Sequence, residues 1–294
     1  MFVAPPRVTA EVVARLPDTF RQHAQPVVRF GVARDCFLEG PAFDAHGRLY
    51  MVDIPYGRIF RMDPSGAFTL VARYDGLPNG LKVMPDGSLL VTDHVRGLLR
   101  IDPENGAVET VLAVAHGEPF KGLNDLFIAR GGEIYFTDQG ASGINEPRGA
   151  VYCLNLDGRL MRLLDNVPSP NGIVCSPDER ILYVAVTRSN QIWSVPLTQF
   201  EPGVIRRAGV FQNLSGGTGP DGLAMSARGA LCVAHIGLGV VWVFDPRGEP
   251  VLRIDAPTGP GVTNLAFHPQ DPDSLYITES ASGHVLRASL KGVV

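Results

Sequence analysis

The chain has 294 residues, of which 45% are hydrophobic and 19% are charged, and its formal net charge at pH 7 is −4. A chain of this length and composition can bury a large core, and a weakly acidic chain without a basic stretch is not expected to bind nucleic acid or an anionic membrane. No apolar run approaches the roughly 20 residues that a membrane-spanning helix needs.

The N-terminal residues and the cysteines indicate in which cellular compartment the protein is expected. Residues 1–6 lack the basic-then-apolar layout of a secretory signal. The cysteines are scattered and form no close pair, so we interpret them as mostly buried small hydrophobic residues in a reducing environment. They are Cys36, Cys153, Cys175 and Cys232. We therefore expect a cytoplasmic protein, and we find no signal for a particular oligomeric state.

Two regions are expected along the chain. Residues 1–25 are interpreted as an N-terminal extension, and residues 26–294 as a single domain. Within the extension, residues 8–21 are expected to form a short helix, with Thr9 or Asp18 as candidate caps.

A short sequence motif that begins with an oxygen-bearing polar residue recurs six times, and we call this first residue the head of each repeat. The heads are Glu39, Asn79, Asn124, Asn171, Asp221 and Thr263. They follow one another at intervals of 40 to 50 residues, about the length of one four-stranded propeller blade. We therefore predict an all-β fold, a six-bladed β-propeller with four antiparallel strands in each blade.

The second repeat shows the pattern of one blade, because Gly- and Asp-containing turns separate four runs rich in Leu and Val. The expected strands are residues 79–84, 88–93, 98–102 and 107–114. The third repeat carries an insertion at residues 139–148, and the sixth ends after three strands near Leu290. We expect the strand-like residues 26–32 to supply the missing outer strand of blade six, which would remove two exposed sheet edges.

Polar residues are expected to gather at one mouth of the central tunnel. In an antiparallel hairpin, the start of the first strand and the end of the second lie at the same end. The heads therefore share a mouth with a second column formed by the ends of the second strands. That column consists of Asp53, Asp93, Asp138, Val186, His235 and Glu279.

This concentration favours a bound divalent cation. Carboxylates that converge in a partly buried tunnel would repel one another and lose hydration. The heads offer only hard oxygen donors, which suit Ca²⁺, Mg²⁺ or Mn²⁺ better than Zn²⁺, and a wide tunnel favours Ca²⁺. A structural interpretation stays open, because Asn-Gly is a common turn dipeptide and Asp at a strand end often caps a loop.

Five segments of the chain resemble the senescence marker protein/gluconolactonase superfamily. They are Glu39-Gly40-Pro41, Leu123-Asn124-Asp125-Leu126 and the runs 135–140, 168–172 and 219–224. That superfamily consists of six-bladed propellers and includes regucalcin and diisopropylfluorophosphatase. The resemblance covers nearly the whole chain, from about Cys36 to Leu290.

The resemblance implies a metal-dependent hydrolase that opens a small lactone, with the metal ion as Lewis acid. Glu39, Asn171 and Asp221 match the metal ligands of the family, and Asn124 matches a position that contacts the metal in some members and the substrate in others. Asp221 also matches the general base, or the nucleophile of the phosphatase branch.

One departure from the family concerns the substrate. Animal gluconolactonases carry a substrate-binding arginine two residues before the blade-three asparagine, whereas this chain has Gly122, with Lys121 beside it. Either Lys121 takes over the contact with a sugar-acid lactone, or the pocket suits a different lactone. Arg188 is a second candidate for binding an acidic substrate or product, against the alternative of an ordinary solvated charge.

His235 is a candidate catalytic residue, because it occupies the second column in the same blade as Asp221. It could orient water or move a proton, and the alternative is a histidine held in the tunnel wall. No serine-nucleophile elbow, dinucleotide fingerprint or zinc spacing is found.

Three functions remain open from the sequence. The first is a lactonase acting on a sugar-acid lactone, and the second is an organophosphate or ester hydrolase that uses the same metal site. The third is a calcium-binding propeller without catalysis.

Overall fold

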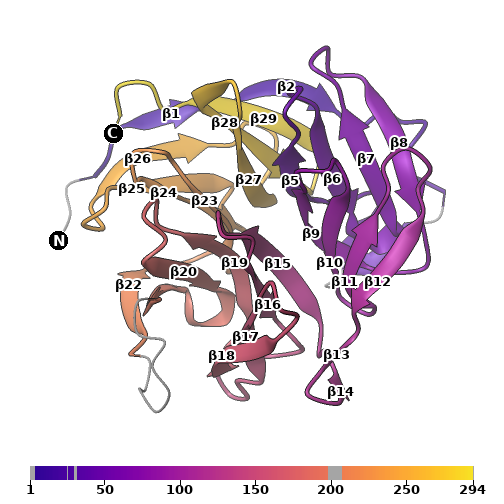
Figure 1. Cartoon of the computed structure of the whole chain (residues 1–294). Coiled ribbons are helices and arrows are strands. Elements are labelled where there is room, and N and C mark those ends of the chain that lie inside the picture. The colour runs from indigo at the N-terminus through magenta and orange to yellow at the C-terminus, as the bar shows by residue number, and fades with distance from the viewer. Residues whose placement is uncertain (1–3, 25, 30–31, 198–206, 294) are drawn as a thin grey trace.

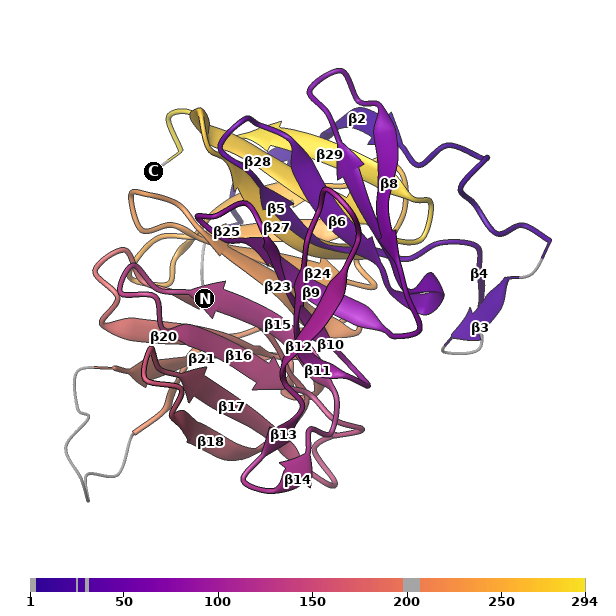
Figure 2. The same ribbon diagram turned by 45° about the vertical axis from the view of Figure 1, so that its right-hand side comes forward.

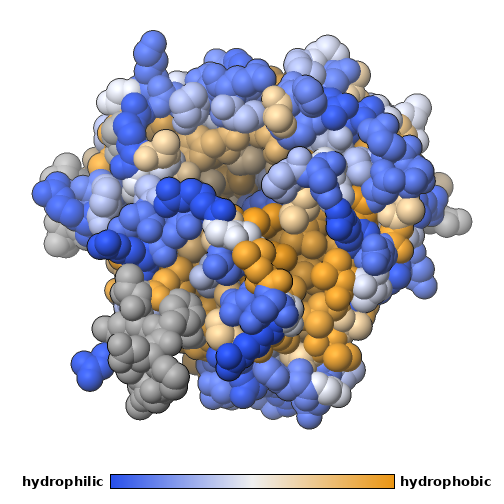
Figure 3. Space-filling view, viewed as in Figure 1, coloured by the Kyte–Doolittle hydropathy of each residue, from blue (hydrophilic) through white to orange (hydrophobic). Residues whose placement is uncertain are grey.

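The computed structural model describes residues 4–24, 26–29, 32–197 and 207–293. It confirms the six-bladed propeller: six sheets lie around a common axis, each with its first strand innermost (Figure 1). The innermost strands contact one another in sequence and close a ring around the axis. On the face seen in Figure 3, hydrophilic residues cover most of the periphery and hydrophobic residues line the hollow near the centre.

The first three blades follow the predicted order of strands from the axis outward. Blade one consists of β5 (Leu38–Phe43), β6 (Leu49–Asp53), β7 (Arg58–Met62) and β8 (Phe68–Arg73). Blade two consists of β9 (Pro78–Val83), β10 (Leu89–Asp93), β11 (Gly97–Ile101) and β12 (Val108–Leu112). Blade three consists of β15 (Leu123–Ile128), β16 (Ile134–Asp138), β17 (Gly149–Leu154) and β18 (Leu160–Val167). A small hairpin of β13 (Val114–Ala115) and β14 (Glu118–Pro119) joins blades two and three.

The last three blades repeat this arrangement. Blade four consists of β19 (Pro170–Cys175), β20 (Ile181–Val186), β21 (Gln191–Pro196) and β22 (Gly209–Asn213). Blade five contains β23 (Gly219–Met225), β24 (Leu231–Ile236), β25 (Val240–Phe244) and β26 (Pro250–Asp255). The three inner strands of blade six are β27 (Val262–His268), β28 (Asp271–Glu279) and β29 (His284–Ser289).

The strand that completes blade six does not come from the predicted segment. It is β2 (Glu11–Arg15), which pairs antiparallel with β29, while β1 (Arg7–Thr9) adds a parallel fifth strand to blade five beside β26. The helix expected over residues 8–21 is therefore wrong. The valines of β1 and β2 favour extended backbone, and two open sheet edges give that backbone partners.

Residues 26–32 do not close the propeller, and that prediction is also wrong. Instead, β3 (Val27–Arg29) and β4 (Val32–Arg34) pair with each other in a separate hairpin. Figure 2 shows this hairpin at the side of the molecule, apart from the blades. Residues 30 and 31 lie outside the described residues.

The core lies between neighbouring blades. One buried apolar cluster combines Leu16 with Leu38 and Leu49 of blade one and Val285 of blade six, so the N-terminal strands are anchored where the first and last blades meet. All four cysteines are buried and none forms a disulfide, as expected. The described residues contain two short 3₁₀ turns, η1 (Ile54–Tyr56) and η2 (Thr187–Ser189), and no helix of theirs has the length and apolarity to cross a bilayer.

Candidate active site

A β-bulge places each repeat head at the tunnel. In blades two to six the pairing of the first and second strands shifts register at the head, and in blade one the shift follows Glu39, which pairs with Val52. In blade four, for example, Pro170 pairs with Val186 and the next paired residue is Ile173, so Asn171 lies within the bulge. A bulge bends the strand and turns the side chain away from the regular alternation. The backbone of the bulge therefore sets the direction in which the side chain of the head points.

The residue after four of the heads is a glycine because neighbouring blades approach closely there. A Cβ atom on Gly172 would overlap the main-chain oxygen of Asp221 in the next blade. A Cβ atom on Gly40 would lie about 2.5 Å from the main-chain oxygen of Asn79. A side chain at either position would push the heads of adjacent blades apart.

Threonine hydroxyl groups hold the heads across the gaps between blades. Oγ1 of Thr92 donates a hydrogen bond to the main-chain oxygen of Asn124 at 2.5 Å, and Oγ1 of Thr137 donates to that of Asn171 at 2.8 Å. Thr187 bonds in the same way to Pro220, the residue before Asp221, at 2.7 Å. Each of these threonines is buried. They are absent from the sequence-based site, although the pairs Thr92-Asp93 and Thr137-Asp138 repeat at the ends of second strands.

Glu39 and Asp221, from blades one and five, interact inside the tunnel. The side chains are 3% and 7% exposed. Burial raises the pKa of the Glu39 carboxyl group well above its usual range, and the negative charges of Asp221 and then Asp125 raise it further. Hydrogen bonds from Asn264 and from the Gly40 amide oppose this shift. Two buried acidic groups thus repel each other when both are ionised.

Asn124 and Asn171 complete the set of predicted metal residues, and both are buried. The side-chain oxygen Oδ1 of Asn171 is buried and accepts no hydrogen bond from the described residues. An unpaired buried carbonyl oxygen is costly unless it has a partner such as a cation. Two carboxylates and two amide oxygens fit a hard divalent ion. Among the described residues no group of three His, Cys, Asp or Glu side chains forms a metal cluster, so a cation here would depend on the amides.

His235 is also buried, and local partners engage both nitrogens of its ring. The indole Nε1 of Trp242 donates to Nδ1 at 3.2 Å, and Nε2 lies 3.0 Å from the main-chain oxygen of Gly216. Because an indole only donates, Nδ1 must accept and Nε2 must carry the proton. Burial lowers the pKa of His235, which favours this neutral form. The catalytic role expected for His235 stays a prediction.

The two basic candidates lie near the insertion of blade three. Nζ of Lys121 donates to the main-chain oxygen of Arg148 at 2.9 Å, so this ammonium group is tied to the insertion. Arg188 is exposed and lines a cavity of about 380 Å³ together with residues 141–146. The roles of Lys121 and Arg188 in binding substrate stay predictions.

The ends of the second strands hold the segments that lead into the first strands. Each of three carboxylates accepts a hydrogen bond from a main-chain amide just before the innermost strand of its own blade. The pairs are Asp53 with Phe37 at 2.7 Å, Asp138 with Lys121 at 3.1 Å, and Glu279 with Gly261 at 3.0 Å. These residues stabilise the mouth that displays the heads.

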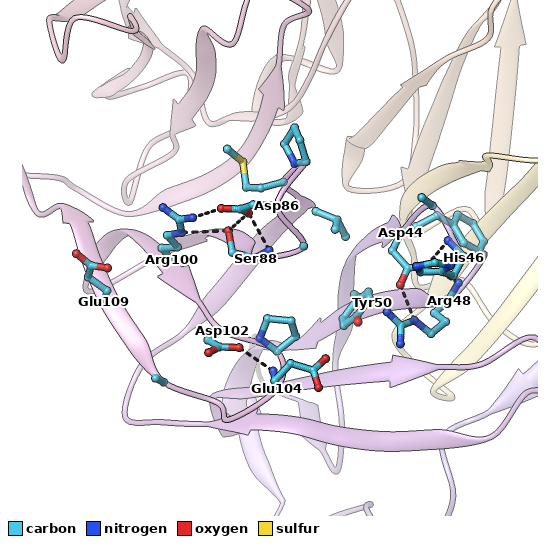
Figure 4. A pocket seen from close by; sticks show the side chains of 18 of the residues that line it. Asp44, His46, Arg48, Tyr50, Asp86, Ser88, Arg100, Asp102, Glu104 and Glu109 are labelled. Atoms are coloured by element: carbon cyan, nitrogen blue, oxygen red, sulfur yellow. Dashed lines mark hydrogen bonds and ion pairs between the residues drawn. The ribbon is translucent and has the colours of Figure 1, made fainter.

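A groove of about 910 Å³ lies elsewhere, between blades one and two. Turns between first and second strands line it, so it lies at the opposite end of the blades from the heads. Figure 4 shows Asp86 paired with Arg100 on one side and Asp44 paired with Arg48 on the other. Because these charges neutralise one another, we place the candidate site at the buried heads instead.

Comparison with known proteins decides the family. The sequence model of one protein family, described as the SMP-30/gluconolactonase/LRE-like region, matches residues 37–281 of this chain. The chain belongs to this family. The resemblance of the repeat phrases to the SMP-30/gluconolactonase group is thereby confirmed.

Several curated members of the SMP-30/gluconolactonase family are similar over most of this chain. A gluconolactonase of Zymomonas mobilis is 29% identical, with 86% of this chain and 78% of the relative covered. The lactonase drp35 of Staphylococcus epidermidis is 28% identical, with 79% and 74% covered. The diisopropyl-fluorophosphatase of Loligo vulgaris is 28% identical, with 84% and 87% covered.

Solved structures of the family support the fold. A calcium-binding protein, regucalcin, from Agrobacterium tumefaciens has a TM-score of 0.78 at 23% identity, with 99% of this chain and 96% of that chain covered. A gluconolactonase from Xanthomonas campestris has a TM-score of 0.75 at 24% identity, with 98% and 99% covered.

Proposed function

We propose that this protein is a divalent-cation-dependent hydrolase that opens the ring of a small lactone, with a sugar-acid lactone as the first candidate. The buried pair of Glu39 and Asp221, together with the buried and unpaired Oδ1 of Asn171, carries this proposal. The similarity to a gluconolactonase and to a lactonase supports hydrolysis of a lactone.

Glu39, Asn124, Asn171 and Asp221 would hold the cation, and Ca²⁺ suits their oxygen donors best. A cation bound there would supply Lewis-acid polarisation of an ester carbonyl group. The similarity to a protein called calcium-binding, and to a fluorophosphatase of the same family, supports a divalent ion.

The chain's own groups would then handle the proton and the leaving group. A carboxylate oxygen of Asp221 would take a proton from the attacking water, a contribution typically worth ~10²–10⁴-fold in rate. The buried amide of Asn124 would hold the ring oxygen or a hydroxyl group of the lactone. Arg188, exposed at the cavity beside residues 141–146, would attract the carboxylate that ring opening creates.

The experiment is an acid-release assay on chelator-treated protein with a panel of sugar and aliphatic lactones, with Ca²⁺, Mg²⁺, Mn²⁺ or Zn²⁺ added back. We expect turnover that needs a cation and that falls ~10²-fold or more in Asp221→Asn. Asp102→Asn, a carboxylate of the distant groove, is the matched control and should keep the activity.

A second candidate is hydrolysis of an organophosphate ester on the same residues. The fluorophosphatase relative favours it, at an identity nearly equal to that of the gluconolactonase. Cleavage of a fluorophosphate without turnover of any lactone would support this candidate. Cation binding without turnover of either class would contradict both and would leave a binding propeller.

A further inference from the structure

A layer of two polar side chains lies directly behind the repeat heads. The residue after the head is glycine in blades one, two, four and five, but it is Asp125 in blade three and Asn264 in blade six. Both side chains are 2% exposed. Blades three and six stand opposite each other in a ring of six. A Cβ atom on Gly222 would overlap the amide of Asn264, so the glycine leaves the space that this amide fills.

The hydrogen bonds of Asn264 fix the orientation of its amide. Its oxygen Oδ1 accepts from the main-chain nitrogen of Leu265 at 2.8 Å. The nitrogen Nδ2 must therefore face the carboxylates. It donates to Oε2 of Glu39 at 2.9 Å and lies 3.3 Å from Oδ2 of Asp125. A single amide thus bridges two acidic groups that come from blades one and three.

Asp125 is held in turn from its other side. Its Oδ1 accepts from the main-chain nitrogen of Leu126 at 2.8 Å and lies 3.9 Å from Nζ of Lys82. Lys82 belongs to the innermost strand of blade two and is partly exposed. The described residues thus form a continuous polar chain from Glu39 through Asn264 and Asp125 to Lys82.

We propose that Asn264 is a positioning residue for the candidate cation site. Its amide holds Oε2 of Glu39, to which the Gly40 amide also donates, whereas no described residue donates a hydrogen bond to Oε1. The second oxygen therefore stays available to a cation in a fixed orientation. The Asp125–Lys82 pair holds the amide from behind. This inference rests on the proposed function and adds a residue that touches neither cation nor substrate.

Loss of such a supporting hydrogen bond typically weakens metal binding by 10–100-fold. Asn264→Leu keeps nearly the same side-chain volume and removes the donor. We expect its dissociation constant for Ca²⁺, measured by isothermal titration calorimetry, to rise on the order of 10–100-fold. The Ca²⁺ concentration that gives half-maximal turnover should rise in parallel, whereas kcat at saturating Ca²⁺ should stay close to that of the unaltered protein.

The control is Ser226→Ala, which removes the buried hydrogen bond that the Ala230 amide donates to Oγ of Ser226 in a turn of blade five. It should lower the thermal midpoint without changing the affinity for Ca²⁺. Asn264→Ala adds no bulk and serves as a second variant with the same expected loss of affinity, should Asn264→Leu not fold.

The outcomes separate this inference from the proposed function. If the unaltered protein binds Ca²⁺ and the Asn264 variants bind within two-fold of it, the positioning role is overturned and the cation site stands. If the unaltered protein binds none of Ca²⁺, Mg²⁺ and Mn²⁺, the proposed function fails and the positioning role fails with it.

Discussion

Oγ1 of Thr137 on blade three donates a hydrogen bond to the main-chain oxygen of Asn171 on blade four, 2.8 Å away. Both residues are buried, so the bond links two blades at the bulge that carries the candidate ligand Asn171. The position of that ligand consequently depends on the packing of two blades against each other.

Thr137→Val removes this link with little change in shape. A buried carbonyl oxygen left without a donor costs about 1–3 kcal/mol, so we expect the free energy of unfolding, measured with urea, to fall by about that amount. The affinity for Ca²⁺ should fall as well. Thr110→Val, on the exposed outer strand of blade two, is the control and should stay within about 0.5 kcal/mol. Equal stability of the two variants would show that the bond between blades is dispensable.

Glu39→Gln should stabilise the protein when cations are removed. The pKa of Glu39 lies above its ordinary value of 4.5 because of burial and the charges of Asp221 and Asp125. A carboxyl group whose pKa is raised by folding contributes stability at low pH, and this contribution is lost as the pH rises through the folded-state pKa. In chelator at pH 8 the variant should therefore have the higher thermal midpoint, and the difference should vanish below about pH 4.

When Ca²⁺ is added, the unaltered protein should instead have a higher thermal midpoint than Glu39→Gln. Ligand binding stabilises only the form that holds the ligand, so the midpoint of the unaltered protein should rise and that of Glu39→Gln should stay. A lower midpoint for Glu39→Gln in chelator at pH 8 would contradict the electrostatic argument.

His235 should make stability depend on pH in the opposite sense. Burial lowers its pKa below the ordinary 6.5, so the unfolded chain binds the proton more readily. The contribution of His235 is then complete above about pH 6.5 and is lost as the pH falls from there through the lower folded-state pKa. His235→Gln should flatten the dependence of the unfolding free energy on pH between about pH 5 and 7. An unchanged slope would mean that other groups dominate this range, and kcat of the same variant tests the catalytic role.

Removal of the first fifteen residues should open the propeller. This deletion takes away both β1 and β2 and exposes the edges of β26 and β29. Unpaired edges promote association between chains, so we expect a lower thermal midpoint and aggregates in size-exclusion chromatography with light scattering. Deletion of residues 1–9 is the matched comparison, because it removes β1 but keeps β2 in blade six. Two equally stable truncated proteins would show that β2 does not close the ring.

The blades could be predicted from the sequence because each repeat carries its own turns and alternating strands. The heads could be found for the same reason, since Glu39, Asn124, Asn171 and Asp221 stand at matching places in a local pattern. The closing strand could not, because β2 and β29 come from opposite ends of the chain and their pairing depends on which edge remains open.

The contacts inside the tunnel could not be predicted from the sequence for a related reason. Asn264 meets Asp125 over 139 positions of sequence, and Trp242 reaches His235 only because the third strand of blade five folds back beside the second. The sequence did contain one usable sign. Glycine follows four of the six heads, so the polar residues Asp125 and Asn264 break the pattern at two opposite blades.

The strand that closes the ring also sets the order of events during synthesis. β2 leaves the ribosome before any of the six blades, whereas its partner β29 is the third strand of the sixth blade. At ~5–20 residues per second, the interval between them is roughly 15–60 s. During that time the nascent chain carries a strand without its partner, and the ring can close only after translation of the sixth blade. β2 therefore pairs with β29 only after the strands of all six blades have been translated, although β2 precedes all of them in the chain.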